Sequence, residues 1–164
     1  MTKDVRPSAV VPGPPRAVRA AALWWVTAVG AGVVETIGTV AVLASHGEST
    51  EVLGVGLGVR AVIYALVLLV VSRLWRGHPW ARWVLAVGLG VFGTLSLVAE
   101  PIGWLLAGHS LGALLASTDL ELALVIAIRA VHVAAVMAAC VCMFRPASNA
   151  YLRRAVGQRG SGVG

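Results

Sequence analysis

Charged residues are scarce in this chain of 164 residues, where they make up 12% of the sequence, against roughly 25% in soluble domains. Acidic residues are rarer still, since only seven occur. This composition excludes an ordinary soluble domain, which needs a charged surface. The net charge of +6 does not indicate nucleic acid as a partner, because the basic residues lie in short groups between apolar runs.

Cysteine and histidine are also too few for a recognisable cofactor site. The two cysteines, Cys140 and Cys142, are two positions apart, so on a helix they point to different sides and lack the spacing of a redox pair. Of the four histidines only His132 falls inside an apolar run, whereas a haem between helices needs a facing pair. We therefore predict no cofactor, no metal site and no catalytic residue.

Long apolar runs dominate the chain, which is 59% hydrophobic and has a mean hydropathy of +0.88. Each of four runs reaches the roughly 20 residues that a helix needs to cross a bilayer. None alternates with the period of two that marks barrel strands. We expect an all-α membrane protein with four transmembrane helices, at 20–45, 52–72, 83–107 and 120–144.

These helices define a transmembrane domain at 20–145 between two cytoplasmic tails. The proline-rich segment 1–19 is typical of a disordered tail, and 146–164 forms the second tail. The first apolar run is longer than the roughly 7–15 residues of a signal-peptide core, and it contains Glu35. We therefore interpret it as an uncleaved helix.

Basic residues set the orientation in the membrane. Eleven of the 13 lie in the two tails or between the second and third runs, whereas the other two connections carry only acidic charges. The positive-inside rule places both termini in the cytoplasm of a multi-pass protein of the cytoplasmic membrane. The eleven residues are Lys3, Arg6, Arg16, Arg19, Arg73, Arg76, Arg82, Arg145, Arg153, Arg154 and Arg159.

The sequence contains an internal repeat that predicts two similar helical hairpins. "VRAVIYA" at Val59–Ala65 resembles "IRAVHVA" at Ile128–Ala134, and the helix before each carries one lone carboxylate, Glu35 or Glu100. This agreement predicts tandem hairpins related by a pseudo-two-fold axis along the membrane normal.

Two acids and two arginines share one level of the membrane. Glu35, Arg60, Glu100 and Arg129 lie about 20–27 Å above the cytoplasmic arginines, at about 1.5 Å of helix rise per residue. An unpaired charge there costs at least about 2.5–3.5 kcal/mol, so we expect each acid to pair with an arginine. Pairing within each hairpin and crossed pairing between hairpins fit the sequence equally.

Three further polar side chains extend this predicted cluster. Tyr64 lies one turn after Arg60, and Ser96 lies one turn before Glu100. His132 follows Arg129 by one turn and has no counterpart in the first hairpin. We favour a neutral, hydrogen-bonded His132 over a titrating relay.

Two cytoplasmic segments carry a resemblance. "RGHPWARWVL", which includes Trp80 and Trp83, is similar to a basic-aromatic interfacial anchor. "FRPASNAYLRR" places Pro146 at a helix end and Tyr151 at the interface. In these features the chain resembles small uncharacterised four-helix integral membrane proteins of actinobacteria. The resemblance implies the topology and supplies no site residues.

The predicted function is that of an accessory, structural or assembly component, with the charge layer holding the helices in register. The alternative is a small transporter or channel subunit that uses the Glu/Arg/His cluster. The expected partners are the lipid bilayer and another membrane protein or a second copy of the chain.

Overall fold

The computed structural model describes residues 13–47, 49–108 and 120–160, and all regular structure within these ranges is helical. The tail at 1–12 and the connection at 109–119 lie outside the described residues. In chain order the elements are α1 (Arg16–Ser45), α2 (Thr50–Trp75), α3 (Pro79–Leu85), the π-helical segment η1 (Ala86–Gly93), α4 (Thr94–Leu106), α6 (Leu120–Phe144) and α7 (Pro146–Gly160).

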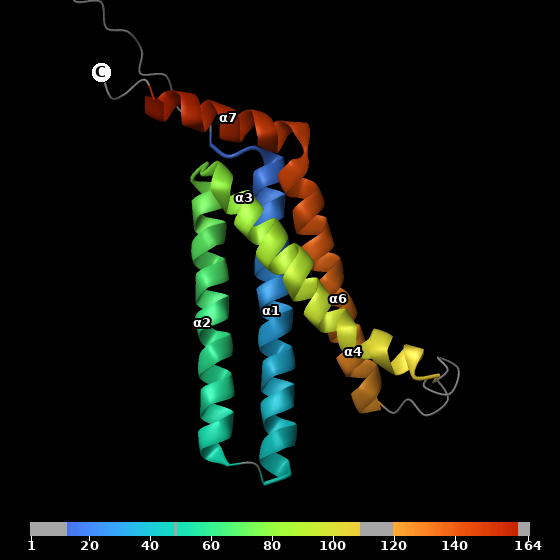
Figure 1. The fold of residues 1–164 in the computed structure, drawn as a ribbon. Helices are drawn as coiled ribbons and strands as arrows, with labels where there is room; N and C mark the ends of the chain where they lie inside the picture. Colours follow the sequence, from blue (N-terminus) through green and yellow to red (C-terminus); the bar gives the residue numbers. More distant parts are fainter. Residues whose placement is uncertain (1–12, 48, 109–119, 161–164) are drawn as a thin grey trace, which may run out of the picture.

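Helix α1 is the centre of the fold and packs most extensively against α6 and then α2 (Figure 1). Its buried positions recur every three to four residues, and most are small, as at Ala21, Ala28 and Gly32. Small residues at this spacing let neighbouring helices approach closely. The small-residue face of α1 therefore allows α6 and α2 to pack closely against it.

The tightest packing lies in the half of the bundle where α1 begins and α6 ends. The indole of Trp25 is fully buried there, and its Nε1 donates a hydrogen bond to Sδ of Met143 over 3.4 Å. Ala135 and Ala139 of α6 are also fully buried. This contact gives the polar edge of a buried tryptophan a partner, as such side chains require.

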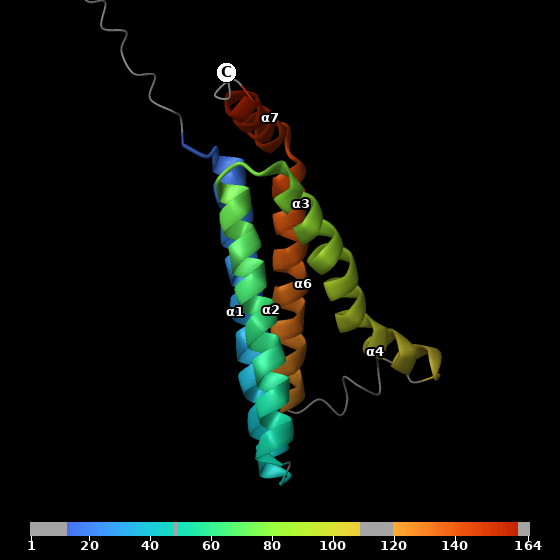
Figure 2. The same ribbon diagram turned by 60° about the vertical axis from the view of Figure 1, so that its left-hand side comes forward.

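The segment expected as one helix at 83–107 begins earlier, at Pro79, and is divided into three parts. α3 leads into η1, whose sequence AVGLGVFG is rich in glycine, and α4 follows. Glycine weakens α-helical preference, and a π-helical stretch is often found beside a functional site. Figure 2 shows the segment diverging from α1 and α6 toward the end of α4.

The second hairpin is therefore not packed like the first. α1 and α2 lie side by side, whereas α4 makes only slight contact with α6. Gly90 of η1 lies against α6, because a Cβ there would lie 3.1 Å from Sγ of Cys140.

Part of the expected cytoplasmic tail forms α7, which lies across the end of the bundle where α1 begins (Figure 1). Leu152 of α7 is buried. The hydroxyl of Tyr151 donates to the backbone carbonyl of Trp75 over 3.0 Å, and Nη1 of Arg82 donates to Oδ1 of Asn149 over 2.6 Å. α7 is thus docked on the α2–α3 turn.

Among the described residues, three helices are long and apolar enough to cross a membrane: Arg16–Ser45, Leu53–Trp75 and Leu122–Phe144. Their outward side chains are apolar and exposed, as Leu23 (67%), Ile37 (63%) and Val62 (60%) illustrate. Such surfaces suit lipid and not water. The chain is therefore a membrane protein with an all-helical fold.

The α2–α3 turn gives a first prediction. Gly77 has φ +78°, and a Cβ there would lie 2.7 Å from Cβ of Ala155 in α7. We expect Gly77→Ala to combine a backbone cost of roughly 1–2 kcal/mol with displacement of α7. Thermal unfolding in detergent measures the loss.

Gly47 provides the matched control for this substitution. Its φ is +80°, and a Cβ there would meet nothing within 4 Å. Gly47→Ala should therefore lower the melting temperature less than Gly77→Ala. Equal losses would show that α7 does not rest on this turn.

Candidate functional site

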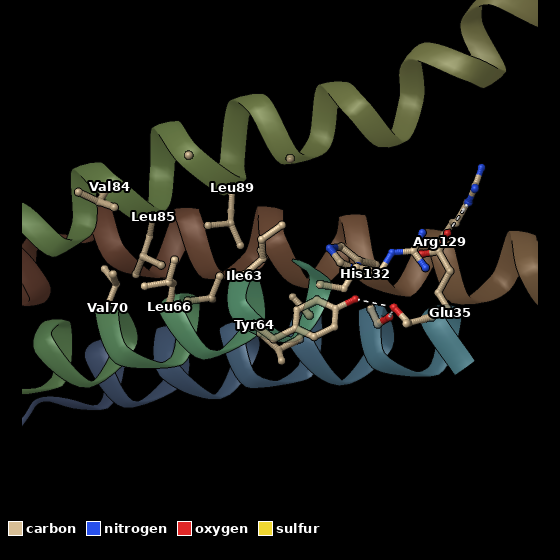
Figure 3. Close-up of a pocket in the computed structure, with 18 residues that line it drawn as sticks. Glu35, Ile63, Tyr64, Leu66, Val70, Val84, Leu85, Leu89, Arg129 and His132 are labelled. Atoms are coloured by element: carbon tan, nitrogen blue, oxygen red, sulfur yellow. Dashed lines mark hydrogen bonds and ion pairs between the residues drawn. The ribbon is translucent and has the colours of Figure 1, made fainter. Parts of the chain in front are cut away.

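A cavity of about 640 Å³ lies among α1, α2, α6 and the α3–η1 segment (Figure 3). Polar side chains gather at one end, namely those of Glu35, Thr36, Arg60, Tyr64, Arg129 and His132. Aliphatic side chains line the other end, namely those of Ile63, Leu66, Val70, Val84, Leu85 and Leu89. The cavity is thus amphipathic along the length of the bundle.

An ion pair at the polar end joins the first and last apolar helices. Nε of Arg129 in α6 donates to Oε1 of Glu35 in α1 over 2.9 Å. The two side chains are 35% and 22% exposed, so the pair is largely shielded and its attraction is stronger than it would be in water. The sequence left open whether Glu35 pairs within its own hairpin or with the second hairpin. Glu35 pairs with Arg129 of the second hairpin.

A hydroxyl network connects α1 with α2 beside this pair. Oγ1 of Thr36 donates to the carbonyl of Gly32 over 2.8 Å and lies 2.9 Å from the hydroxyl of Tyr64. Because the single proton of Thr36 is used on Gly32, the Tyr64 hydroxyl donates to Thr36. Tyr64 also covers Gly32, where a Cβ would lie 2.9 Å from the tyrosine oxygen.

Arg60 lies at the polar end on α2, and its side chain is exposed. It makes no hydrogen bond or ion pair with any residue that the structure describes. The expected partner within its hairpin, Glu35, is held by Arg129. Arg60 therefore lines the cavity without a counter-charge among the described residues.

His132 lines the cavity one turn along α6 from Arg129 (Figure 3). Its Nδ1 is buried and has no hydrogen-bond partner among the described residues. The hydrogen bond expected for a neutral histidine is therefore not formed at this nitrogen.

Two predicted site residues are described only by their backbone. Ser96 and Glu100 lie on α4, and their side chains are outside the described part of the structure. Within the described ranges no three His, Cys, Asp or Glu side chains gather as a metal site would require.

The sequence analysis missed Thr36 and the glycines of η1 as parts of this site. Thr36 follows the predicted acid directly, and its position one turn from Gly32 was the available signal. Gly88 and Gly93 of η1 line the cavity, but nothing in the sequence predicted that this segment leaves the bundle.

The comparisons with known proteins add no assignment. No protein-family model, no curated protein and no solved structure matches the chain. The function is therefore argued from the fold and the site.

The hydroxyl network gives a second prediction. Tyr64→Phe and Thr36→Val should each lower the free energy of unfolding by about 0.5–1.5 kcal/mol, the usual net contribution of a hydrogen bond. The double variant should lose less than the sum, because both changes remove the same bond. Unfolding in mixed detergent micelles measures all three.

Thr27→Val is the control, since Thr27 is an exposed residue of the same helix whose hydroxyl bonds only the carbonyl of Leu23. We expect a change within about 0.5 kcal/mol for this variant. Additive losses for Tyr64→Phe and Thr36→Val would contradict the network.

Proposed function

We propose that the chain is an accessory or structural component of the cytoplasmic membrane, whose intramembrane charges fix the arrangement of its helices. The observation that carries this proposal is the ion pair between Glu35 and Arg129, which joins the two most extensively packed helices. A carboxylate and a guanidinium that satisfy each other specify one register between α1 and α6.

Energetics favour an architectural role for this pair. Either charge alone within the apolar span would cost at least about 2.5–3.5 kcal/mol. Pairing the two charges offsets this free-energy cost, and it does so only in the arrangement of α1 and α6 that brings them together. A transporter that used Glu35 as a carrier would have to break this bond in each cycle, so transport is the less supported role.

The proposed topology has four spans, with both termini in the cytoplasm. Its support is the position of the basic residues, because Arg16, Arg73, Arg82 and Arg145 all lie near the end of the bundle that α7 covers. Arg153 of α7 is exposed at this end, where a basic residue suits anionic lipid.

The fourth span in this proposal is the segment 79–106, formed jointly by α3, η1 and α4. Its total length exceeds the roughly 20 residues that a span needs. The matching segments Val59–Ala65 and Ile128–Ala134 support a pseudo-two-fold relation in the sequence of the two hairpins, although the second hairpin is packed more loosely than the first. The resemblance to small actinobacterial membrane proteins is also part of the proposal. Its partner is another membrane protein or a second copy of the chain.

Charge exchange tests the architectural role. Glu35→Arg and Arg129→Glu should each reduce the amount of folded protein in the membrane several-fold, because each leaves like charges facing one another. The double exchange should restore much of that amount. Quantitative immunoblotting of membranes and size-exclusion profiles in mild detergent measure the effect.

The matched control exchanges the alternative pair. Glu35→Arg with Arg60→Glu should not restore the protein, since Glu35 forms its ion pair with Arg129 and not with Arg60. If both single variants accumulate and fold normally, the pair is not architectural and this proposal fails.

Cysteine labelling tests the topology. In a background with Cys140 and Cys142 replaced by alanine, Ser49→Cys and Ala107→Cys should react with a membrane-impermeant maleimide in intact cells. Arg153→Cys should react only after permeabilisation. Protection of Ala107→Cys in intact cells would show that the segment 79–106 does not cross the membrane.

A further inference from the structure

The polarity of the cavity matches a molecule that is charged at one end and apolar along its length. Figure 3 shows the aliphatic side chains of Val70 and Leu85 at one end of the cavity. The polar side chains of Tyr64 and His132 lie toward the other end. The volume of about 640 Å³ lies within the roughly 300–1,000 Å³ typical of small-molecule sites.

The charge of the polar end selects an anion. Two guanidinium groups and one carboxylate are among the residues that line the cavity. The carboxylate of Glu35 is engaged by Arg129 over 2.9 Å. Among the described residues that line the cavity, Arg60 is therefore the cation without a carboxylate partner. A guanidinium in an apolar setting needs an anionic partner, and it can hold a carboxylate or phosphate by two parallel hydrogen bonds.

The apolar end has room for an alkyl chain. From Arg60 to Val70 the helix α2 rises about 15 Å, and this length of the cavity wall is aliphatic apart from Tyr64. The opposite wall is formed by η1, where a Cβ on Gly88 would meet nothing within 4 Å. The glycine of η1 thus leaves space where a side chain would otherwise stand.

The direction of the cavity also fits a lipid-like molecule. With the orientation proposed above, Arg60 lies in the outer half of the membrane and Val70 lies nearer the cytoplasm. A head group on Arg60 would therefore have its chain directed inward, as lipids of the outer leaflet have.

We infer that the cavity is a binding site for an anionic amphiphile, with its carboxylate or phosphate on Arg60 and its alkyl chain along Ile63, Leu66 and Leu89. The shared chemistry is an anionic head on an apolar chain, supplied by a free alkyl acid or by an anionic phospholipid. This site does not depend on the accessory role, because the pair of Glu35 and Arg129 stays intact when the ligand is bound.

Native mass spectrometry of the full chain released from dodecyl maltoside micelles tests the site. Laurate should remain bound as a single adduct, whereas dodecanol, which has the same chain and no charge, should not. Arg60→Gln should reduce laurate occupancy at least about tenfold, as expected for the loss of a charge-assisted bond. Arg60→Lys should retain part of the binding.

A second pair of variants tests the apolar end. Gly88→Leu places a side chain in the cavity and should abolish the laurate adduct although Arg60 is present. Gly30→Leu is the control, because Gly30 is exposed, does not line the cavity and has nothing within 4 Å of its Cβ position. Equal occupancy in wild type, Arg60→Gln and Gly88→Leu would overturn the inference, as would equal retention of laurate and dodecanol by the wild type alone.

The source of the ligand is decided by a parallel titration with phosphatidylglycerol and phosphatidylcholine. Displacement of laurate by phosphatidylglycerol alone identifies an anionic phospholipid as the ligand class. Retention of laurate in the presence of both lipids identifies a free alkyl acid. If neither laurate nor phosphatidylglycerol binds, there is no anionic amphiphile site, whereas the charge-exchange result for Glu35 and Arg129 is unaffected.

Discussion

The attraction between one carboxylate and one guanidinium inside the membrane is the constraint on which this structure depends. Glu35 and Arg129 are joined over 2.9 Å, and either charge alone in hydrocarbon would cost at least about 2.5–3.5 kcal/mol. The small-residue faces of α1 and α6 meet in the half of the bundle where α1 begins and α6 ends. α2 is held against α1 by the neighbouring hydroxyl network, and the cavity is the space that these three helices and η1 leave between them.

The bundle is closed at one end and open toward the other. Trp25 and Met143 fill the interior where α7 covers it, whereas the divergence of α4 leaves the level of Arg60 unfilled. The same departure of the 79–106 segment thus creates both the cavity and the exposure of its cation. The architectural role and the proposed binding role therefore belong to different arginines. Arg129 pairs with Glu35, and Arg60 would hold the ligand.

Composition and hydropathy were sufficient to predict an all-helical membrane protein, since three of the expected spans are continuous helices of suitable length. Three of the four charges expected at one level, Glu35, Arg60 and Arg129, line the same cavity. The sequence could not decide their pairing, because Arg60 and Arg129 are equivalent in depth and differ only in how the helices pack. The π-helical η1 and the docked α7 were not predicted either. Both depend on contacts across the fold, such as Gly90 with Cys140 and Tyr151 with Trp75, and such contacts leave no local pattern.

The separation of 94 residues between Glu35 and Arg129 has a consequence for biosynthesis. A chain enters the membrane from its N-terminus, so the carboxylate reaches hydrocarbon long before its final partner is synthesised. Arg60 is the first cation to arrive at the same depth, and it belongs to the next helix. Arg60 is therefore the first counter-ion available to Glu35 during synthesis, whereas in the folded chain Arg129 pairs with Glu35 and Arg60 has no ion-pair partner among the described residues.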